Sequence, residues 1–162
     1  MIVVTVGTQL PFDRLIMMID EIAPSLSEEV FSQIGAGHFK PVNHSWSANV
    51  EASEFDQKLR SCSLIVSHAG IGTVLKAYAY RKPIILVPRL SSFGEHRNDH
   101  QLATVGALKE RPGIYIAESK AQLNDLLLAG DLKPALASNE IERSKRRLQS
   151  YLREAVLEAL QS

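Results

Sequence analysis

Short apolar runs of strand length alternate along this chain with longer segments of helical periodicity. Most of the runs are rich in valine and isoleucine, and we predict strands at residues 2–6, 30–35, 46–50, 64–67, 84–87 and 113–117. Runs that are apolar at nearly every position are typical of strands covered on both faces, as in a parallel sheet. Strands that alternate with helices form right-handed βαβ units. The sequence therefore predicts an α/β fold with a Rossmann-like, doubly wound parallel sheet.

Apolar residues recur at spacings of three and four between and after the predicted strands. This pattern predicts amphipathic helices at residues 12–23, 53–62, 73–80, 99–110, 119–128 and 139–160. Ser53 and Ser119 are expected to cap two of them, because a serine side chain can accept a hydrogen bond from a free amide at a helix start. The last predicted helix is strongly charged between its apolar positions. It could pack on its own sheet, dock against a partner, or touch anionic lipid.

Length and composition favour one soluble domain. The chain has 162 residues, so we predict a single domain over residues 1–162, with residues 139–162 as a C-terminal helix. Lysine plus arginine and aspartate plus glutamate balance at 18 each, which gives no sign of general nucleic-acid binding. The N-terminus lacks a signal-peptide pattern, and no window approaches the ~18 consecutive apolar residues of a membrane span. The single cysteine, Cys62, fits a reducing, cytoplasmic compartment and is expected to be buried.

Residues 64–76 combine a strand, a tight turn and a helix start. The apolar run ends at His68, Gly70 and Gly72 follow, and the helical pattern begins at Thr73. The first amides of a helix are unpaired and the helix dipole is positive there, so such a turn attracts phosphate. Glycines would allow a bulky anion to approach the backbone closely. The same glycines would also suit an ordinary turn with no ligand.

The segment 89–101, after another predicted strand, is dense in hydrogen-bonding side chains. Seven consecutive polar residues occupy positions 95–101. Asparagine, aspartate and glutamine suit paired donor and acceptor contacts with sugar hydroxyls. A solvated loop in which Asn98 or Asp99 caps the next helix would explain part of the pattern as well. Ligands of doubly wound sheets bind beyond the carboxyl ends of the strands, where this segment would lie.

Two other classes of site are weakly supported. His68, His96 and His100 suggest a metal, but the chain lacks the His-Glu-x-x-His form and an Asp-x-Asp pair. A dinucleotide site is also weakly supported, because residues 6–11 read Val-Gly-Thr-Gln-Leu-Pro and not Gly-x-Gly-x-x-Gly. We therefore expect no metal and no cofactor.

Three stretches together carry a family resemblance. They are Val-Thr-Val-Gly-Thr-Gln at 4–9, Ser-His-Ala-Gly-Ile-Gly-Thr at 67–73, and Pro-Arg at 88–89 with Gly-Glu-His-Arg-Asn-Asp-His-Gln at 94–101. They resemble the C-terminal domain of family 28 glycosyltransferases, in particular the short bacterial exopolysaccharide subunits. Those subunits are similar to the eukaryotic soluble subunit of the dolichol-linked N-acetylglucosaminyltransferase. The resemblance implies half of a GT-B fold, the half that binds a nucleotide sugar, usually UDP-linked.

The resemblance also implies roles for individual residues. The diphosphate would be lined by two turns, which contribute Gly7, Thr8 and Gln9, and His68, Gly70, Gly72 and Thr73. Asp99 and Gln101 would contact the donor sugar. Weaker contacts are expected from Glu95, His96 and Asn98. One position departs from the family pattern: Lys76 stands where many members carry a glutamate that accepts hydrogen bonds from ribose. Lysine cannot accept a hydrogen bond, so three explanations stay open: ribose is held otherwise, Lys76 meets a charge, or Lys76 is only a solvated helix residue.

The function implied is that of the donor-binding, catalytic subunit of an inverting UDP-sugar glycosyltransferase, which extends a lipid-linked glycan in exopolysaccharide biosynthesis. In GT-B enzymes the acceptor site and usually the base lie on the other half of the fold. Because the chain starts at the donor domain's first strand, a membrane-anchored acceptor-domain partner is expected, which would recruit it to the inner face of the membrane. His68 and His96 are alternative candidates for the base. A non-enzymatic nucleotide-sugar-binding or regulatory module is the competing hypothesis.

Overall fold

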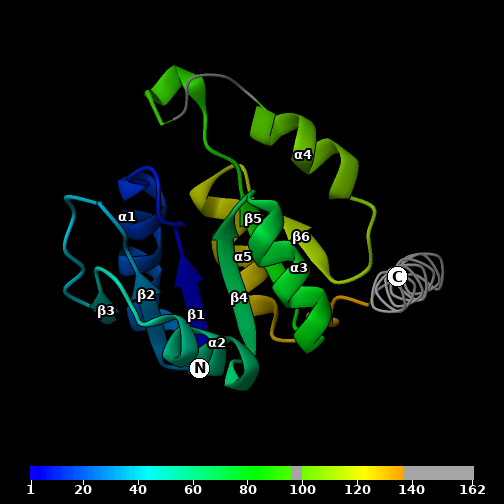
Figure 1. The fold of residues 1–162 in the computed structure, drawn as a ribbon, viewed down its shortest axis with the longest axis horizontal. Helices are drawn as coiled ribbons and strands as arrows, with labels where there is room; N and C mark the ends of the chain where they lie inside the picture. The colour runs from blue at the N-terminus through cyan, green and yellow to red at the C-terminus, as the bar shows by residue number, and fades with distance from the viewer. Residues whose placement is uncertain (96–99, 137–162) are drawn as a thin grey trace, which may run out of the picture.

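The computed structural model describes residues 1–95 and 100–136. In this part of the chain six parallel strands form one sheet in the order β3-β2-β1-β4-β5-β6. The strands are β1 (Ile2–Thr5), β2 (Val30–Gln33), β3 (Ser45–Ser47), β4 (Leu64–His68), β5 (Ile84–Val87) and β6 (Ile114–Ile116). Every predicted strand is present, and the Rossmann-like parallel sheet is confirmed (Figure 1).

Helices connect the strands as the periodicity predicts. They are α1 (Asp13–Ile22), α2 (Ala52–Ser61), α3 (Ile71–Tyr80), α4 (His100–Leu108) and α5 (Lys120–Ala129), with short 3₁₀ turns η1 (Ala23–Ser25) and η2 (Ser91–Phe93). The predicted helix at residues 139–160 lies outside the described residues. The prediction that Ser119 caps α5 is confirmed, because its side chain accepts a hydrogen bond from the Gln122 amide.

The predicted Ser53 cap of α2 is wrong. The N-cap is Glu51, whose carboxylate accepts hydrogen bonds from the amides of Ser53 and Glu54. The helix therefore begins at Ala52, ahead of the predicted start. Glutamate can replace serine here because its longer side chain curls back onto the same free amides, and its negative charge suits the positive end of the helix dipole.

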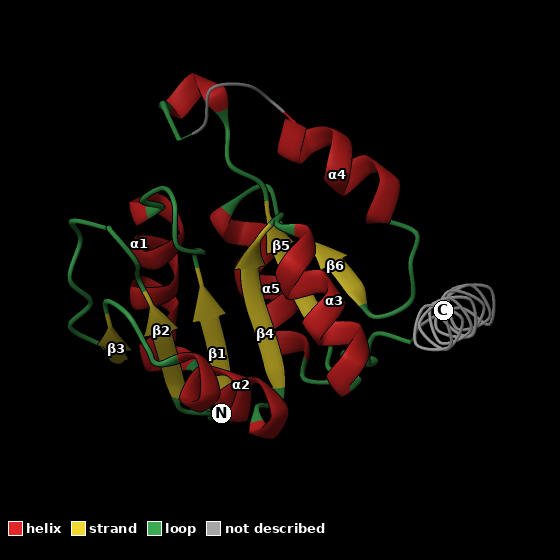
Figure 2. Ribbon diagram, viewed as in Figure 1, coloured by secondary structure: helices red, strands yellow, loops and turns green. Residues whose placement is uncertain are grey.

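Helices lie on both sides of the sheet (Figure 2), and strands β1, β4 and β5 are buried on both faces, as their apolar runs predict. In β1, Ile2 and Val4 pack in one core cluster with residues of α1 and α5, while Val3 packs in the other with residues of α2, α3 and α4. Alternate side chains of a strand point to opposite faces, so one continuous apolar run serves two cores. Cys62 is buried in the second cluster, as predicted.

The strand order places one crevice at the centre of the sheet. The chain goes from β1 outward to β2 and β3, and then returns to the other side of β1 to build β4, β5 and β6. The strands β1 and β4 are neighbours, but the connection after β1 leads to β2 on one side and the connection after β4 leads to β5 on the other. In doubly wound sheets this switch point is where ligands bind. Two of the three predicted ligand segments, after β1 and after β4, meet there.

Candidate functional site

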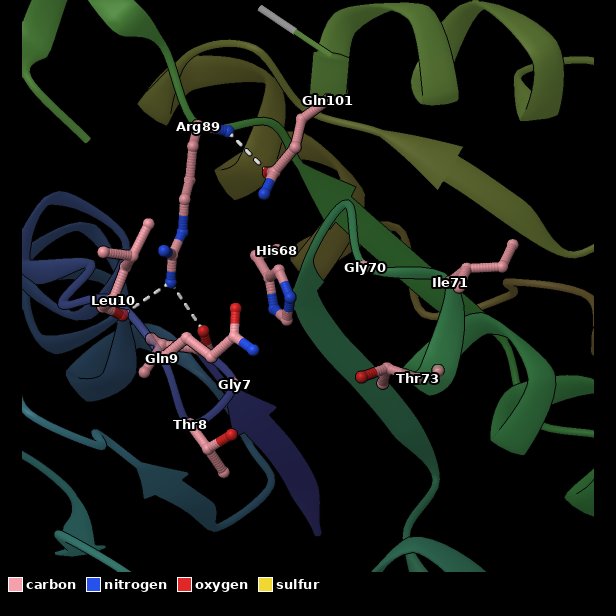
Figure 3. Close-up of a pocket in the computed structure, with 12 residues that line it drawn as sticks. Gly7, Thr8, Gln9, Leu10, His68, Gly70, Ile71, Thr73, Arg89 and Gln101 are labelled. Carbon is pink, nitrogen blue, oxygen red and sulfur yellow. Dashed lines mark hydrogen bonds between the residues drawn. The ribbon is translucent and has the colours of Figure 1, made fainter. Parts of the chain in front are cut away.

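A pocket of about 510 Å³ opens at this switch point. Three segments distant in sequence line it: the loop after β1, the β4–α3 turn, and the segment after β5 with the start of α4 (Figure 3). The lining residues are Val6, Gly7, Thr8, Gln9, Leu10, His68, Gly70, Ile71, Gly72, Thr73, Arg89 and Gln101. The structure therefore brings together eight of the predicted binding residues, Gly7, Thr8, Gln9, His68, Gly70, Gly72, Thr73 and Gln101.

The His68 ring lies between two glycines that have no room for a side chain. A Cβ built on Gly70 would be 2.3 Å from His68 Nε2, and one on Gly7 would be 2.8 Å from His68 Cε1. Gly7 also has a φ of 78°, a conformation that other residues rarely adopt. Both glycines are thus required by the packing of His68, whatever the ligand.

Gly72 differs, because a Cβ there would meet nothing within 4 Å. It lies in the first turn of α3, where glycine is less favourable than alanine by up to about 1 kcal/mol. Packing in the free protein gives no reason for glycine at this position. Since Gly72 lines the pocket, room for a ligand close to the backbone is the remaining physical reason.

The first turn of α3 supplies the electropositive part of the pocket. Gly70 is the N-cap and Ile71 begins the helix, two residues before the predicted start at Thr73. The first amides of an α-helix have no partner within the helix, and the helix dipole adds partial positive charge. Ile71, Gly72 and Thr73 all line the pocket, so this end of the helix faces the cavity.

Arg89 is the principal pocket residue that the sequence analysis did not assign to the site. Its side chain is buried, at 3% exposure, and its Nη2 donates to the carbonyl oxygens of Val6 at 2.6 Å and Leu10 at 2.8 Å (Figure 3). The guanidinium therefore ties the loop after β1 to the segment after β5. The available signal was its position: an arginine two residues after a fully apolar strand, at the edge where ligands bind.

Gln101, at the start of α4, forms part of the same wall. Its Oε1 accepts a hydrogen bond of 3.0 Å from the Arg89 backbone amide. This contact leaves the NH₂ group of the amide to face the pocket that Gln101 lines (Figure 3). The predicted residues His96, Asn98 and Asp99 lie outside the described residues.

Glu95 does not line this pocket. Its carboxylate receives two hydrogen bonds from Arg14 on α1, at 2.7 and 2.8 Å, beside a separate cavity of about 320 Å³. Lys76 is absent from the lining residues as well. Its ammonium donates to the Asp56 carboxylate on α2 and, at 3.3 Å, to the Tyr80 hydroxyl. Of the explanations offered for Lys76, contact with a charge is the one that the structure shows.

The sequence profile of the glycosyltransferase family 28 C-terminal domain matches residues 1–155. The chain belongs to this family. The match covers all three pocket segments and confirms the resemblance carried by their motifs. A search of curated proteins found no match.

Solved structures similar to this family 28 domain are GT-B glycosyltransferases. The glycosyltransferase of kitacinnamycin has a TM-score of 0.58 at 17% identity, over 80% of this chain and 35% of that one. MurG from Acinetobacter baumannii has 0.57 at 19% identity, over 78% and 40%. SsfS6 from Streptomyces sp. SF2575, solved with thymidine diphosphate, has 0.54 at 20% identity, over 92% and 36%. The family 28 domain thus has the fold of one half of a GT-B enzyme and spans less than half of each chain.

His68 in the family 28 domain is neutral at physiological pH. Burial, together with the nearby charge of Arg89, lowers the pKa of His68 from 6.5 to about 4, and a hydrogen bond with the Thr5 backbone only partly opposes this. A neutral imidazole can donate one hydrogen bond to a phosphate but brings no positive charge. A pKa this low also makes His68 a weak base at pH 7.

The neutral state of His68 predicts a pH dependence of stability. Between pH 6.5 and about 4 the unfolded chain binds a proton that native His68 does not, so the free energy of unfolding should fall as pH falls through this range. A change of about 2 kcal/mol is expected for this half-buried group. Urea titrations of wild type and His68→Gln at pH 7 and pH 4.5 test this. The wild type should lose more stability than the variant; an equal loss would contradict the shifted pKa.

A second cluster, formed by Ser32, His44 and Asp20, resembles the Ser-His-Asp triad of hydrolases in its contacts but cannot act as one. Ser32 Oγ lies 2.7 Å from His44 Nε2, and His44 Nδ1 lies 3.1 Å from Asp20 Oδ1. Ser32 is completely buried in β2, so no substrate can reach its hydroxyl. Asp20 also accepts hydrogen bonds from the amides of Val42 and Asn43. The cluster therefore fixes the loop before β3.

Within residues 1–95 and 100–136, no three histidine, cysteine, aspartate or glutamate side chains are grouped to hold a metal ion. None of the helices in those ranges has the length and apolar character needed to cross a bilayer.

Proposed function

We propose that the chain is the donor-binding subunit of an inverting glycosyltransferase that uses a UDP-linked sugar. The observation that carries this proposal is the convergence of the β1 loop, the α3 N-terminus and Gln101 on one pocket of a family 28 domain. The bound thymidine diphosphate of the similar enzyme SsfS6 supports a nucleoside diphosphate as the ligand class. The resemblance to exopolysaccharide subunits favours uridine.

In the proposed reaction an acceptor hydroxyl attacks the anomeric carbon of the donor sugar. The bond to the diphosphate breaks, and the nucleoside diphosphate leaves with an additional negative charge. The amides at the start of α3 would stabilise that charge, with His68 donating a hydrogen bond while remaining neutral. The low pKa of His68 supports a base other than His68, either His96 or a residue of the partner.

The acceptor side of the reaction is assigned to another protein in this proposal. A membrane-anchored subunit with an acceptor domain would present a lipid-linked glycan and would hold this chain at the inner face of the membrane. The comparison with GT-B enzymes supports this assignment, since the chain corresponds to 35–40% of the three chains compared. The biological setting we propose is exopolysaccharide biosynthesis.

Calorimetry with UDP, TDP, ADP and a panel of UDP-sugars tests the donor assignment. Wild type should bind UDP-sugars more tightly than UDP, and UDP more tightly than ADP. Gln101→Ala should keep its affinity for UDP within about threefold but lose discrimination among sugars, because it loses the amide that faces them. Gln57→Ala, at an exposed position on α2, is the matched control and should behave as wild type. Absence of binding to every nucleotide would contradict the proposal.

A further inference from the structure

Arg14 on α1 binds the segment after β5 through several contacts at once. Its Nε and Nη2 donate to the two carboxylate oxygens of Glu95, at 2.7 and 2.8 Å, and Nη2 also donates to the Pro88 carbonyl at 2.9 Å. Glu95 Oε2 in turn accepts a hydrogen bond of 2.9 Å from the Leu90 amide. One ion pair therefore fastens both ends of the turn that contains η2 to the first helix.

The surroundings of this pair make it stronger than an ordinary surface ion pair. The Arg14 and Glu95 side chains are only 21% and 10% exposed. The guanidinium also lies 5.2 Å from the ring centres of both Phe12 and Phe93. Two-point contacts between arginine and carboxylate have a defined geometry, and partial removal from water reduces screening. The pair can therefore set the position of the backbone it holds.

That backbone includes Arg89, a principal wall residue of the pocket. Arg89 stands between Pro88, whose carbonyl Arg14 binds, and Leu90, whose amide Glu95 binds. Its own side chain holds the β1 loop and its amide binds Gln101. Among the described residues, Arg14 and Glu95 line the neighbouring cavity and do not line this pocket. Within the described residues, Arg89 is the direct backbone link between the pair and the pocket.

We propose that Arg14 and Glu95 are a positioning pair, which sets the Arg89–Gln101 wall of the nucleotide-sugar pocket. The inference rests on the proposed function for its ligand, but the position of Arg89 can be measured without one. Loss of either partner frees the turn and loosens the wall. Donor affinity then falls, although neither residue touches the donor.

Amide hydrogen exchange of the full chain tests the position directly. In Arg14→Gln and Glu95→Gln, protection of the Arg89 amide should fall about tenfold, while amides of central strand β4 such as Val66 stay unchanged. A fold-wide weakening would lower protection in both places, which separates positioning from general stability. Unchanged protection at Arg89 in both variants, or equal losses at Arg89 and Val66, would overturn the proposal.

Donor binding supplies the second readout. Each single variant should raise the dissociation constant for the UDP-sugar that wild type binds best about tenfold, and the double variant should be no worse, because the two residues act as one unit. Additive losses would overturn the proposal. Glu21→Gln and Lys120→Gln, which break an exposed ion pair between α1 and α5, are matched controls expected to match wild type. If wild type binds no nucleotide, the proposed function fails while the exchange result still decides the positioning role.

Discussion

Replacing Gly70 with alanine should remove nucleotide-sugar binding and destabilise the domain by about 1–3 kcal/mol. The new Cβ would lie 2.3 Å from His68 Nε2, so the ring must leave its place. Little room is left for the ring on the side of Gly7, because even a Cβ built there would lie 2.8 Å from His68 Cε1. The displaced ring would enter the pocket that it now lines. Urea unfolding measures the stability change, and calorimetry with the UDP-sugar panel measures the binding loss.

Gly72→Ala, two residues further on in the first turn of α3, is the control for the stability effect of Gly70→Ala. Its Cβ has open space in the free protein, so the variant should keep or gain stability, by up to about 1 kcal/mol. Diphosphate binding should nevertheless weaken about tenfold, since the methyl group would occupy space next to the ligand. Equal donor affinity in Gly72→Ala and wild type would mean that no ligand approaches the backbone there. Wild-type stability and affinity in Gly70→Ala would contradict the tight contact with His68.

Replacing Arg89 with methionine should cost about 2–4 kcal/mol of stability and most of the donor affinity. Methionine fills similar space but donates no hydrogen bond, so the carbonyl oxygens of Val6 and Leu10 lose their shared partner. The loop after β1, which carries Gly7 and Gln9 into the pocket, is then no longer tied to the segment after β5. Urea unfolding and calorimetry with UDP measure the two effects.

Two further variants serve as controls for Arg89→Met. Arg89→Lys retains the positive charge but has a single ammonium in place of the planar guanidinium, so an intermediate loss is expected. Arg111→Met changes an exposed arginine and should stay within about 0.5 kcal/mol of wild type. A full effect in Arg89→Lys would show that geometry rather than charge is needed. Wild-type behaviour of Arg89→Met would contradict the role given to its hydrogen bonds.

Local patterns predicted the elements of this fold well. The β5 strand at residues 84–87 and the Ser119 cap were correct, because apolar runs and capping side chains act over a few neighbouring residues. The cap of α2 was wrong, because Glu51 lies just ahead of Ser53 and its carboxylate already binds the free amides of Ser53 and Glu54. Choosing between two competent capping residues depends on small differences in backbone geometry. A sequence pattern does not contain those differences.

The pocket was predicted only in part, because local patterns identify its turns but not the contacts between distant segments. Glycines followed by a helix start identify a phosphate-friendly turn locally, and His68, Gly70 and Thr73 do line the cavity. Arg89 was not assigned to the site, because its role depends on hydrogen bonds to Val6 and Leu10, which are distant from it in sequence. Glu95 was expected beside the donor sugar, yet its carboxylate binds Arg14. An arginine on α1 gives no local sign that its partner follows β5.

The sequence by itself determined the parallel sheet, its helices and the three segments that supply the site. Hydrophobic periodicity and turn residues are local properties, and they are readable without knowing what lies opposite. Only the tertiary structure decided how those segments are joined: by Arg89 to the β1 loop, by Arg14 to Glu95, and by Lys76 to Asp56 on α2. The first two contacts depend on strand order, which places the carboxyl ends of β1, β4 and β5 at one edge of the sheet, and the third depends on α2 and α3 packing in the same core cluster. The partner of each of these side chains is therefore set by how distant segments pack together and not by its neighbours in sequence.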